Sequence, residues 1–533
     1  MVDIDSPIPA PVGVLDAFWR YDAALLANDR AALDELFLPG PGTLRGDGRN
    51  LLVGHEAISG FRSARAAIPT RAVTGLHVRV LAADHVLIMA RTAEGAATGL
   101  QTQVWRLTGA GWRVAAAHVS LPAAAPPTGP PPAFDQSVWR VAGAPFAAAL
   151  GHGPLDGLGV AVKDLFAVAG QAVGGGVPAY LAGQRPQPAS APVVTALQRA
   201  GAHLAGIAQT DQFAYSIAGH NAHYGAAPNP AAPGRLGGGS SSGPAAAVAL
   251  GQAAIGLGTD TAGSIRIPAS YQGLVGFRPT HGAVDASGVL PLAPSFDTVG
   301  WLTRDLATSR AVAGVLLPPG AAPSGGAVGR TVRLPAIERL AEPATLALFA
   351  ERVRALEAAG LQPSEQADLT EGTVEEWFAA FRTVQAYEAW QQHGAWITAH
   401  PGALGDDVAG RFAAAAAVTP GQAEDARAVA AKARADLAGC LDGAVLVLPT
   451  APGPAPARSA APAEIDDVRG RTLRMSCLAP LAGAPALSLP AAGAAPVAPV
   501  GICLVGAPGS DAALLALAAG TQPAGALAAG RKS

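Results

Sequence analysis

The sequence predicts a large α/β domain with a layered core, preceded by a small α+β domain. In residues 1–121, patterns with helical spacing come first and alternating apolar residues follow, which is typical of a small α+β unit. In residues 134–533, short apolar strand patterns alternate with helical patterns, as in a layered α/β core. Residues 122–133 between them are nearly all Pro, Ala and Gly, so we expect a semi-rigid linker there.

The first domain is predicted to begin with an amphipathic helix, because apolar residues recur at helical spacing from Val14 to Leu25. From Leu76 to Val80 the period changes to two, as in a strand with one buried face. The expected elements are helices over 14–25, 31–37 and 54–65, then strands over 76–80, 86–90, 101–107 and 112–119.

The second domain is predicted from runs that differ in period and length. Short apolar runs predict strands over 159–166, 203–208, 271–277, 446–449 and 486–490. Longer amphipathic runs predict helices over 192–200, 344–358, 377–397, 423–441 and 512–519, and a further helix beginning at 210–216.

Composition excludes several classes of function. Hydrophobic residues make up 50% of the chain, yet no run of about 20 apolar residues suggests a membrane helix. The formal net charge of −3 argues against nucleic-acid binding driven by phosphate neutralisation. The first residues lack the pattern of a signal peptide, and the 3 cysteines are scattered, so we expect a reducing, cytoplasmic setting. No metal and no cofactor are expected, and a homodimer is compatible with the sequence.

The stretch from Leu236 to Pro268 carries the strongest chemical signal. It contains Gly-Gly-Gly-Ser-Ser-Ser-Gly at 237–243 and Gly-Thr-Asp-Thr-Ala-Gly-Ser-Ile-Arg-Ile-Pro at 258–268. Glycine lets backbone N–H groups turn toward a ligand, and serine becomes a nucleophile when a base removes its proton. Apolar runs with structural punctuation bound both loops, which a flexible linker would not require. We therefore expect a nucleophile beside an anion-binding loop.

A lysine lies near the end of the predicted strand at 159–166. Lys163 shares a face with Ala161, so a buried position in a cleft and a surface position at the strand end both fit. A buried lysine has a depressed pKa and can act as a neutral base.

Together these three segments resemble the amidase signature family, over residues 134 to about 520. The resemblance implies a mixed β-sheet sandwiched between helices, and roles position by position. Ser264 would be the nucleophile, Ser240 the bridging serine next to a non-proline cis peptide bond, and Lys163 the base. The oxyanion hole would be the backbone N–H groups of Thr261, Ala262, Gly263 and Ser264. Ala262 stands where the family commonly has glycine, but alanine keeps the amide. Asp260 and Arg266 are expected to fix the loop through hydrogen bonds.

The first domain resembles the nuclear-transport-factor-2-like superfamily, and more narrowly its AtzH-like members. The resemblance rests on residues 61–65, 102–105 and 116–120. It implies a cone-shaped fold with a pocket for a small anionic ligand, lined by Tyr21, Arg45, Arg62 and His118, with Arg65 nearby. The alternative is an interaction domain without a ligand, whose arginines are solvated.

The sequence does not decide between several classes of substrate. Residues 214–224, 295–300 and 387–390 look closest to indole-acetamide-type hydrolases, which predicts an amidase that releases ammonia or an amine from a small carboxamide. The AtzH-like domain instead suggests carboxylated urea or biuret derivatives. An amidotransferase A-type subunit and a non-catalytic interaction protein are further alternatives. Tyr387 and Trp390 fall in the region that usually walls the acyl pocket, although packing of an amphipathic helix explains them equally well.

Overall fold

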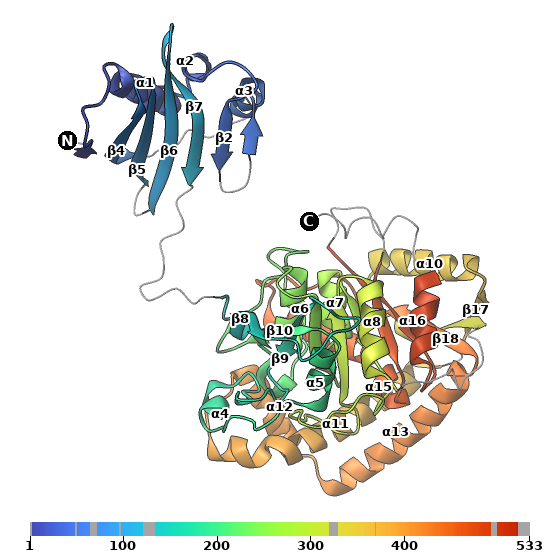
Figure 1. Cartoon of the computed structure of the whole chain (residues 1–533). Helices are drawn as coiled ribbons and strands as arrows, with labels where there is room; N and C mark the ends of the chain where they lie inside the picture. The colour runs from blue at the N-terminus through green and yellow to red at the C-terminus, as the bar shows by residue number, and fades with distance from the viewer. Residues whose placement is uncertain are drawn as a thin grey trace. The chain divides into compact units, whose positions relative to one another are not determined.

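The computed structural model describes residues 3–47, 51–63, 72–94, 97–120, 134–318, 329–367, 369–491 and 498–520. The chain divides into two compact units, Met1–Pro131 and Pro132–Ser533, which are described separately (Figure 1). Within the described residues, no helix combines the length and the apolar character that crossing a bilayer requires.

The N-terminal unit is a seven-stranded sheet in the order β1-β4-β5-β6-β7-β2-β3. Aromatic side chains such as Phe18 and Trp105 fill the core between the sheet and the helices. Its elements are β1 (Asp3–Asp5), α1 (Val14–Ala27), α2 (Arg30–Leu36), β2 (Leu44–Asp47), β3 (Leu51–Val53), α3 (His55–Ser63), β4 (Ala72–Ala82), β5 (His85–Glu94), β6 (Ala97–Thr108) and β7 (Gly111–Ser120). The expected order, helices and then a meander of long strands, is therefore present, with three short strands in addition.

The second unit has an 11-stranded mixed sheet with helices on both faces (Figure 1). Its order is β17-β16-β18-β20-β19-β14-β15-β13-β9-β10-β8. The first half contains β8 (Trp139–Ala147), β9 (Gly159–Lys163), α4 (Pro178–Ala182), α5 (Pro192–Arg199), β10 (His203–Ala208), the 3-10 turn η1 (Gln212–Ala214), β11 (His220–Asn221), β12 (Gly225–Ala226), α6 (Ser242–Ala249), β13 (Ile255–Asp260), α7 (Arg266–Gln272), β14 (Val275–Arg278), β15 (Thr298–Thr303) and α8 (Leu306–Leu316).

The second half adds the remaining helices and the strands of the other sheet edge. These are β16 (Arg330–Arg333), α9 (Pro335–Glu338), α10 (Pro343–Ala358), β17 (Gln362–Gln366), α11 (Glu371–Ala399), α12 (Asp406–Ala416), α13 (Pro420–Leu441), β18 (Ala444–Pro449), α14 (Pro462–Ser476), α15 (Leu478–Ala482), β19 (Ala486–Pro490), β20 (Gly501–Val505) and α16 (Asp511–Gly520). In β18, Val445 and Val447 join one apolar core, whereas Leu446 and Leu448 join another. The strand is thus buried on both faces, as expected for a sheet between two helical layers.

Two neighbouring strands bring the chemistry-bearing residues to one edge of the sheet. β9 and β13 run parallel, with Val160 opposite Ile255 and Val162 opposite Leu257. The carboxyl ends of parallel neighbours meet at the same edge. Lys163 at the end of β9 therefore lies beside the loop that follows β13.

Two sequence predictions for this unit are wrong in detail. Residues 210–216 do not begin a helix, because Phe213 and Ala214 adopt left-handed backbone angles, with φ of 47° and 57°. The Phe213 N–H instead donates to the Gly175 carbonyl at 2.8 Å, which bends the chain into η1. Tyr271 belongs to α7, and the strand begins only at Val275.

Candidate active site

Lys163 is completely buried and is bound by three hydroxyl groups. Its Nζ lies 2.8 Å from the Ser240 Oγ, 3.0 Å from the Ser241 Oγ and 2.9 Å from the Thr259 Oγ1. Ser240 and Ser241 come from the first glycine-serine loop, and Thr259 comes from β13. One amine therefore joins the end of β9 to both segments of the serine stretch.

Burial changes the protonation of this amine. Desolvation lowers the pKa of Lys163 to about 7, while the nearby carboxyls of Asp211, Asp297 and Asp260 oppose the shift. A buried ammonium loses its hydration, so its neutral form is favoured. At and above neutral pH, Lys163 is thus available as a proton acceptor.

The two serine loops are held against each other. The peptide bond between Gly239 and Ser240 is cis. The Ser241 N–H donates to the Ser264 carbonyl at 3.3 Å, and the Thr210 Oγ1 donates to the Ser240 carbonyl at 2.9 Å. Ser264 is only 3% exposed. These bonds bring the segment with Ser240 beside the segment with Ser264.

A buried charge network shapes the loop that carries Ser264. The Asp260 carboxylate accepts from the N–H groups of Gly263 and Ile265 at 3.0 and 3.2 Å. Arg266 donates to it through Nε at 3.0 Å and Nη2 at 2.8 Å, and Arg278 donates to it at 3.2 Å. The two guanidinium groups hold the pKa of Asp260 well below its usual range, against the effect of burial. The expectation that Asp260 and Arg266 fix this loop is confirmed.

This network changes the predicted set of oxyanion donors. The Gly263 N–H is already bonded to Asp260, so it is not a free donor in this structure. In the part of the chain that the structure describes, the N–H groups of Thr261, Ala262 and Ser264 have no acceptor. The Ser476 hydroxyl donates to the Ala262 carbonyl at 2.5 Å, which fixes the orientation of that peptide. Three backbone donors are therefore available to a ligand oxygen.

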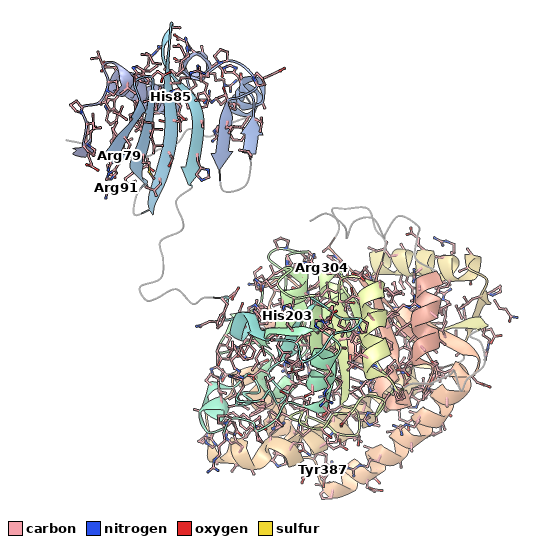
Figure 2. The ribbon with its side chains drawn as sticks, viewed as in Figure 1. Arg79, His85, Arg91, His203, Arg304 and Tyr387 are labelled. Carbon is pink, nitrogen blue, oxygen red and sulfur yellow. The ribbon has the colours of Figure 1, made fainter. Side chains whose placement is uncertain are left out.

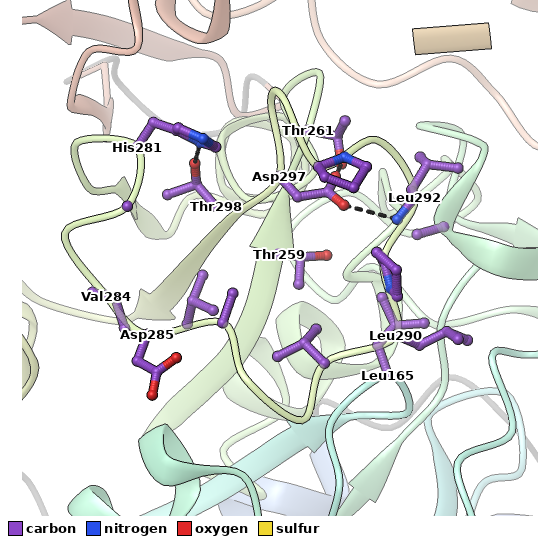
Figure 3. Close-up of a pocket in the computed structure, with 17 residues that line it drawn as sticks. Leu165, Thr259, Thr261, His281, Val284, Asp285, Leu290, Leu292, Asp297 and Thr298 are labelled. Carbon is purple, nitrogen blue, oxygen red and sulfur yellow. Dashed lines mark hydrogen bonds between the residues drawn. The ribbon is translucent and has the colours of Figure 1, made fainter. Parts of the chain in front are cut away.

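A cavity of about 340 Å³ adjoins the loop that carries Ser264 through Thr261, while Ser264 itself does not line it (Figure 3). Thr259 and Thr261 form part of its wall, and most of the rest is apolar. Asp297 closes one side: its carboxylate accepts from the Thr261 Oγ1 at 2.5 Å and from the Leu292 N–H at 2.8 Å. The apolar lining residues are Leu165, Ala214, Val284, Ala286, Val289, Leu290, Pro291, Leu292, Pro294 and Val299.

Tyr387 and Trp390 do not line this cavity. Tyr387 lies at the edge of the unit, with the Arg427 guanidinium 5.3 Å from its ring centroid (Figure 2). Trp390 packs against the apolar core. Both are on α11, whose other positions contact the loop between β14 and β15 that lines the cavity. The assignment of these two residues to an acyl pocket stays a prediction, and it does not concern this cavity.

Sequence analysis did not identify the contacts between α11 and the loop between β14 and β15, which lines the cavity. His393 donates from Nε2 to the Pro291 carbonyl at 2.8 Å and stacks on Phe213 at 4.4 Å between ring centroids. Burial lowers the pKa of His393 to about 4, so the ring is neutral. The Glu388 carboxylate accepts from the N–H and hydroxyl of Ser295 at 2.9 and 2.5 Å.

In the N-terminal unit, three of the four predicted pocket residues are buried together in the interior. Tyr21 is 3% exposed, Arg45 8% and Arg62 7%. The fourth, His118, is exposed on the other face of the sheet, so its assignment is wrong. A bulge in β7 explains the error: Trp105 pairs with Val114 but Val104 pairs with Ala116, so the alternation shifts by one residue. Arg65 lies outside the described residues.

The described residues contain no group of three or more His, Cys, Asp or Glu side chains that could hold a metal ion. All three cysteines are free thiols. Burial raises the pKa of Cys477 to about 12 and that of Cys503 to about 11, so neither is a reactive thiolate at neutral pH.

Comparison with known proteins decides the family. A family model described as Amidase matches residues 135–319. Amidase 1 of Arabidopsis thaliana is 36% identical over 392 residues, which span 68% of this chain and 92% of that protein. The chain belongs to the amidase family. It is accordingly an amide-hydrolysing enzyme.

Solved structures and a second family model extend this result. A crystal structure of an amidase matches with a TM-score of 0.62 and 33% identity, over 68% of this chain and 84% of that chain. Allophanate hydrolase of Kluyveromyces lactis matches with a TM-score of 0.62 and 26% identity, over 69% of this chain and 62% of that chain. A model described as AtzH-like matches residues 4–125, so this amidase carries an AtzH-like N-terminal domain, as predicted.

Proposed function

We propose that the protein cleaves the C–N bond of a small carboxamide through a serine acyl-enzyme. Ser264 is the nucleophile, Ser240 the proton relay and Lys163 the base. The observation that carries the proposal is the buried Lys163 amine 2.8 Å from the Ser240 hydroxyl, in the loop hydrogen-bonded to the Ser264 segment. A serine hydroxyl attacks a carbonyl only when a base takes its proton, and a desolvated amine can supply that base.

In the first half-reaction, the Ser264 Oγ bonds to the amide carbon while its proton passes to Ser240, and the Ser240 proton passes to neutral Lys163. The carbonyl oxygen becomes an oxyanion, which the N–H groups of Thr261, Ala262 and Ser264 bind. One such donor is typically worth about 10²–10³ in rate. The C–N bond then breaks, and the leaving nitrogen receives the proton from Lys163 through Ser240.

In the second half-reaction, water attacks the acyl-enzyme and loses a proton along the same relay. The tetrahedral intermediate collapses, the acyl–oxygen bond to Ser264 breaks, and Ser264 regains its proton. A carboxylic acid is released. Lys163 returns to its neutral form in each turnover, so its own charge state limits the rate at low pH.

The cavity favours an uncharged, apolar acyl group. Among the described residues that line it, none is Lys or Arg, and the acidic ones are Asp285 and Asp297. An allophanate-type substrate has a carboxylate one nitrogen away from the reacting carbonyl, and this carboxylate would lie against this wall without a partner. A buried unpaired charge is costly. An aryl or alkyl amide therefore fits better than a carboxylated urea derivative.

Two assays test this function. A fluorophosphonate probe is expected to label Ser264, and Ser264→Ala is expected to be unlabelled and inactive. In an ammonia-release assay, phenylacetamide and indole-acetamide are expected to react faster than allophanate or carboxybiuret. Labelling at another residue, with Ser264→Ala still active, would overturn the mechanism. Faster release from the carboxylated ureas would overturn the substrate class alone.

We propose a second ligand site inside the N-terminal unit, for a small anion. Within the described residues, both side-chain polar atoms of Gln101 and the Nε2 of Gln103 are buried without a hydrogen-bond partner. Arg62 is buried in the interior of the same unit, with its guanidinium 4.0 Å from the Phe37 ring centroid and its Nη1 3.5 Å from the Asp34 carboxylate. Unsatisfied buried amides are rare in proteins, and a polar ligand would satisfy them. Arg62→Met is expected to abolish anion binding to this unit, measured by calorimetric titration. Unchanged binding would refute the site.

We further propose that the protein acts in a reducing compartment such as the cytoplasm, since its three cysteines are free.

A further inference from the structure

Three arginines from three helices gather around Tyr215, outside the groups that the mechanism uses. Arg411 on α12 donates from Nη1 to the Tyr215 carbonyl at 2.9 Å. Arg382 on α11 and Arg469 on α14 also interact electrostatically with the Tyr215 hydroxyl. Burial raises the pKa of this hydroxyl, and the positive charges of the three guanidinium groups oppose that shift. We refer to Arg382, Arg411 and Arg469 as the arginine cluster.

The arginine cluster has more positive than negative charge. Arg469 is partly buried, and its Nε is inaccessible and has no hydrogen-bond partner. Among the described residues, its guanidinium forms no ion pair, although Asp466 is an acidic neighbour. Arg411 has one carboxylate partner, Asp407, at 3.1 Å, and that carboxylate is 55% exposed. Burial and the two other arginines lower the pKa of Arg469 to about 10, which still leaves it charged at neutral pH.

The same helix shows how an arginine is ordinarily satisfied. Arg471 pairs with Asp467 at 2.8 Å, and Arg474 pairs with Glu375 at 2.7 Å. Arg469 lies on the same helix without such a partner. Arg469 is partly buried, and its Nε has neither a partner nor access to solvent. A guanidinium binds a carboxylate or phosphate through two parallel hydrogen bonds. An anion from outside the described residues would neutralise the positive charge of Arg469.

We propose that the arginine cluster binds a small oxyanion, a carboxylate or a phosphate, with the Tyr215 hydroxyl as a further donor. The arginine cluster is connected to the active-site cavity through Tyr215. Ala214 lines the cavity, and Tyr215 is the next residue along the bent segment after η1. The oxyanion is therefore either a group on the substrate, remote from the reacting amide, or a free anion that binds beside the active site.

Binding is tested on the full chain with malonate and with inorganic phosphate, at constant ionic strength, by calorimetric titration. Arg469→Met is expected to lose about tenfold or more in affinity, as expected for a charge-assisted pair. Arg471→Met is the matched control: it removes the same charge from the same helix and is expected to bind like the parent. Both variants keep Arg62, so the N-terminal unit contributes equally. Arg382→Met, at an exposed position, is expected to weaken binding without affecting folding.

Kinetics with two amides of equal length, one ending in a carboxylate and one in a methyl group, separates the two sources. If the oxyanion belongs to the substrate, Arg469→Met lowers kcat/KM for the carboxylate amide alone, by about tenfold. If the oxyanion is a free anion, Arg469→Met changes kcat/KM for both amides equally. Only the titrations then distinguish Arg469→Met from Arg471→Met. The proposal is overturned if Arg469→Met and Arg471→Met bind both anions equally and do not discriminate between the amides. The titrations need no turnover, so a failure of the proposed catalysis would leave this result intact.

Discussion

At the scale of single residues, the state of one proton controls the site. Lys163 has a pKa of about 7 because burial disfavours its ammonium form. The fraction of neutral amine rises with pH through this value, so kcat is expected to rise along one basic limb centred near pH 7. A pH–rate profile with a neutral amide measures it. If kcat stayed constant over about one pH unit on either side of this pKa of about 7, Lys163 would not be the base.

Substitution of the same residue separates basicity from charge. Lys163→Arg is expected to lose nearly all of kcat, because a guanidinium stays protonated and cannot accept a proton. Lys163→Ala is expected to lose a similar share, with the fold retained in circular dichroism. An arginine variant with near-parental kcat would make Lys163 a structural or electrostatic residue.

The residues that the sequence identified best are those with local signals. Lys163, Ser240 and Ser264 stand in short motifs that resemble the amidase signature, so the resemblance predicts that they lie close together, and their catalytic roles stay predictions. His118 was misplaced because one extra residue in β7 reverses which side chains face inward. Gln101 and His393 had no local signal, since their importance arises only from burial or from contacts between distant elements.

At the scale of elements, α11 controls the shape of the cavity through two contacts with the loop after β14. His393→Leu removes the hydrogen bond to the Pro291 carbonyl and the stacking on Phe213. We expect KM for an aryl amide to rise by about tenfold, a loss of roughly 1.4 kcal/mol in binding, with a smaller change in kcat. Steady-state kinetics checks this split. Tyr387→Leu on the same helix is the control and is expected to leave KM unchanged.

Strand β13 passes close to the first serine loop, and only glycine permits this approach. A Cβ at Gly258 would lie 2.5 Å from the Ser241 Oγ. Gly258→Ala is therefore expected to displace Ser241 from Lys163 and to lower kcat by at least about tenfold.

The control for this change is Gly314→Ala in α8, where a Cβ meets no atom within 4 Å. It is expected to keep full activity and to stabilise the protein by about 0.5–1 kcal/mol. If both alanine variants were equally active, packing at Gly258 would have no role in the site.

Element boundaries were predictable where one pattern dominated. The long helices α10, α11 and α13 were found from their periodicity. The segment after Thr210 was not, because its contacts with Gly175 and the left-handed angles at Phe213 and Ala214 override a helical propensity. Such tertiary competition has no signature within the segment itself.

At the scale of the whole molecule, the two units hold separate apolar cores. A chain beginning at Phe134 is therefore expected to fold and to hydrolyse amides with kcat within about threefold of the parent. Thermal unfolding and steady-state kinetics of the shortened chain test this, on the expectation that compact units fold independently. Loss of turnover in a folded, shortened chain would show that the N-terminal unit contributes to the site.

The order of strands in the large sheet also has a consequence for biosynthesis. β19 and β20, from the last part of the chain, lie in the middle of the sheet, between β18 and β14. On the ribosome, the N-terminal unit has every strand of its own sheet once β7 has emerged. The amidase sheet, in contrast, stays divided into two halves with unpaired inner edges until β20 is made. Nascent chains of this enzyme therefore expose pairing edges until β20 is made, and chaperones that shield such edges are most needed between the synthesis of β18 and that of β20.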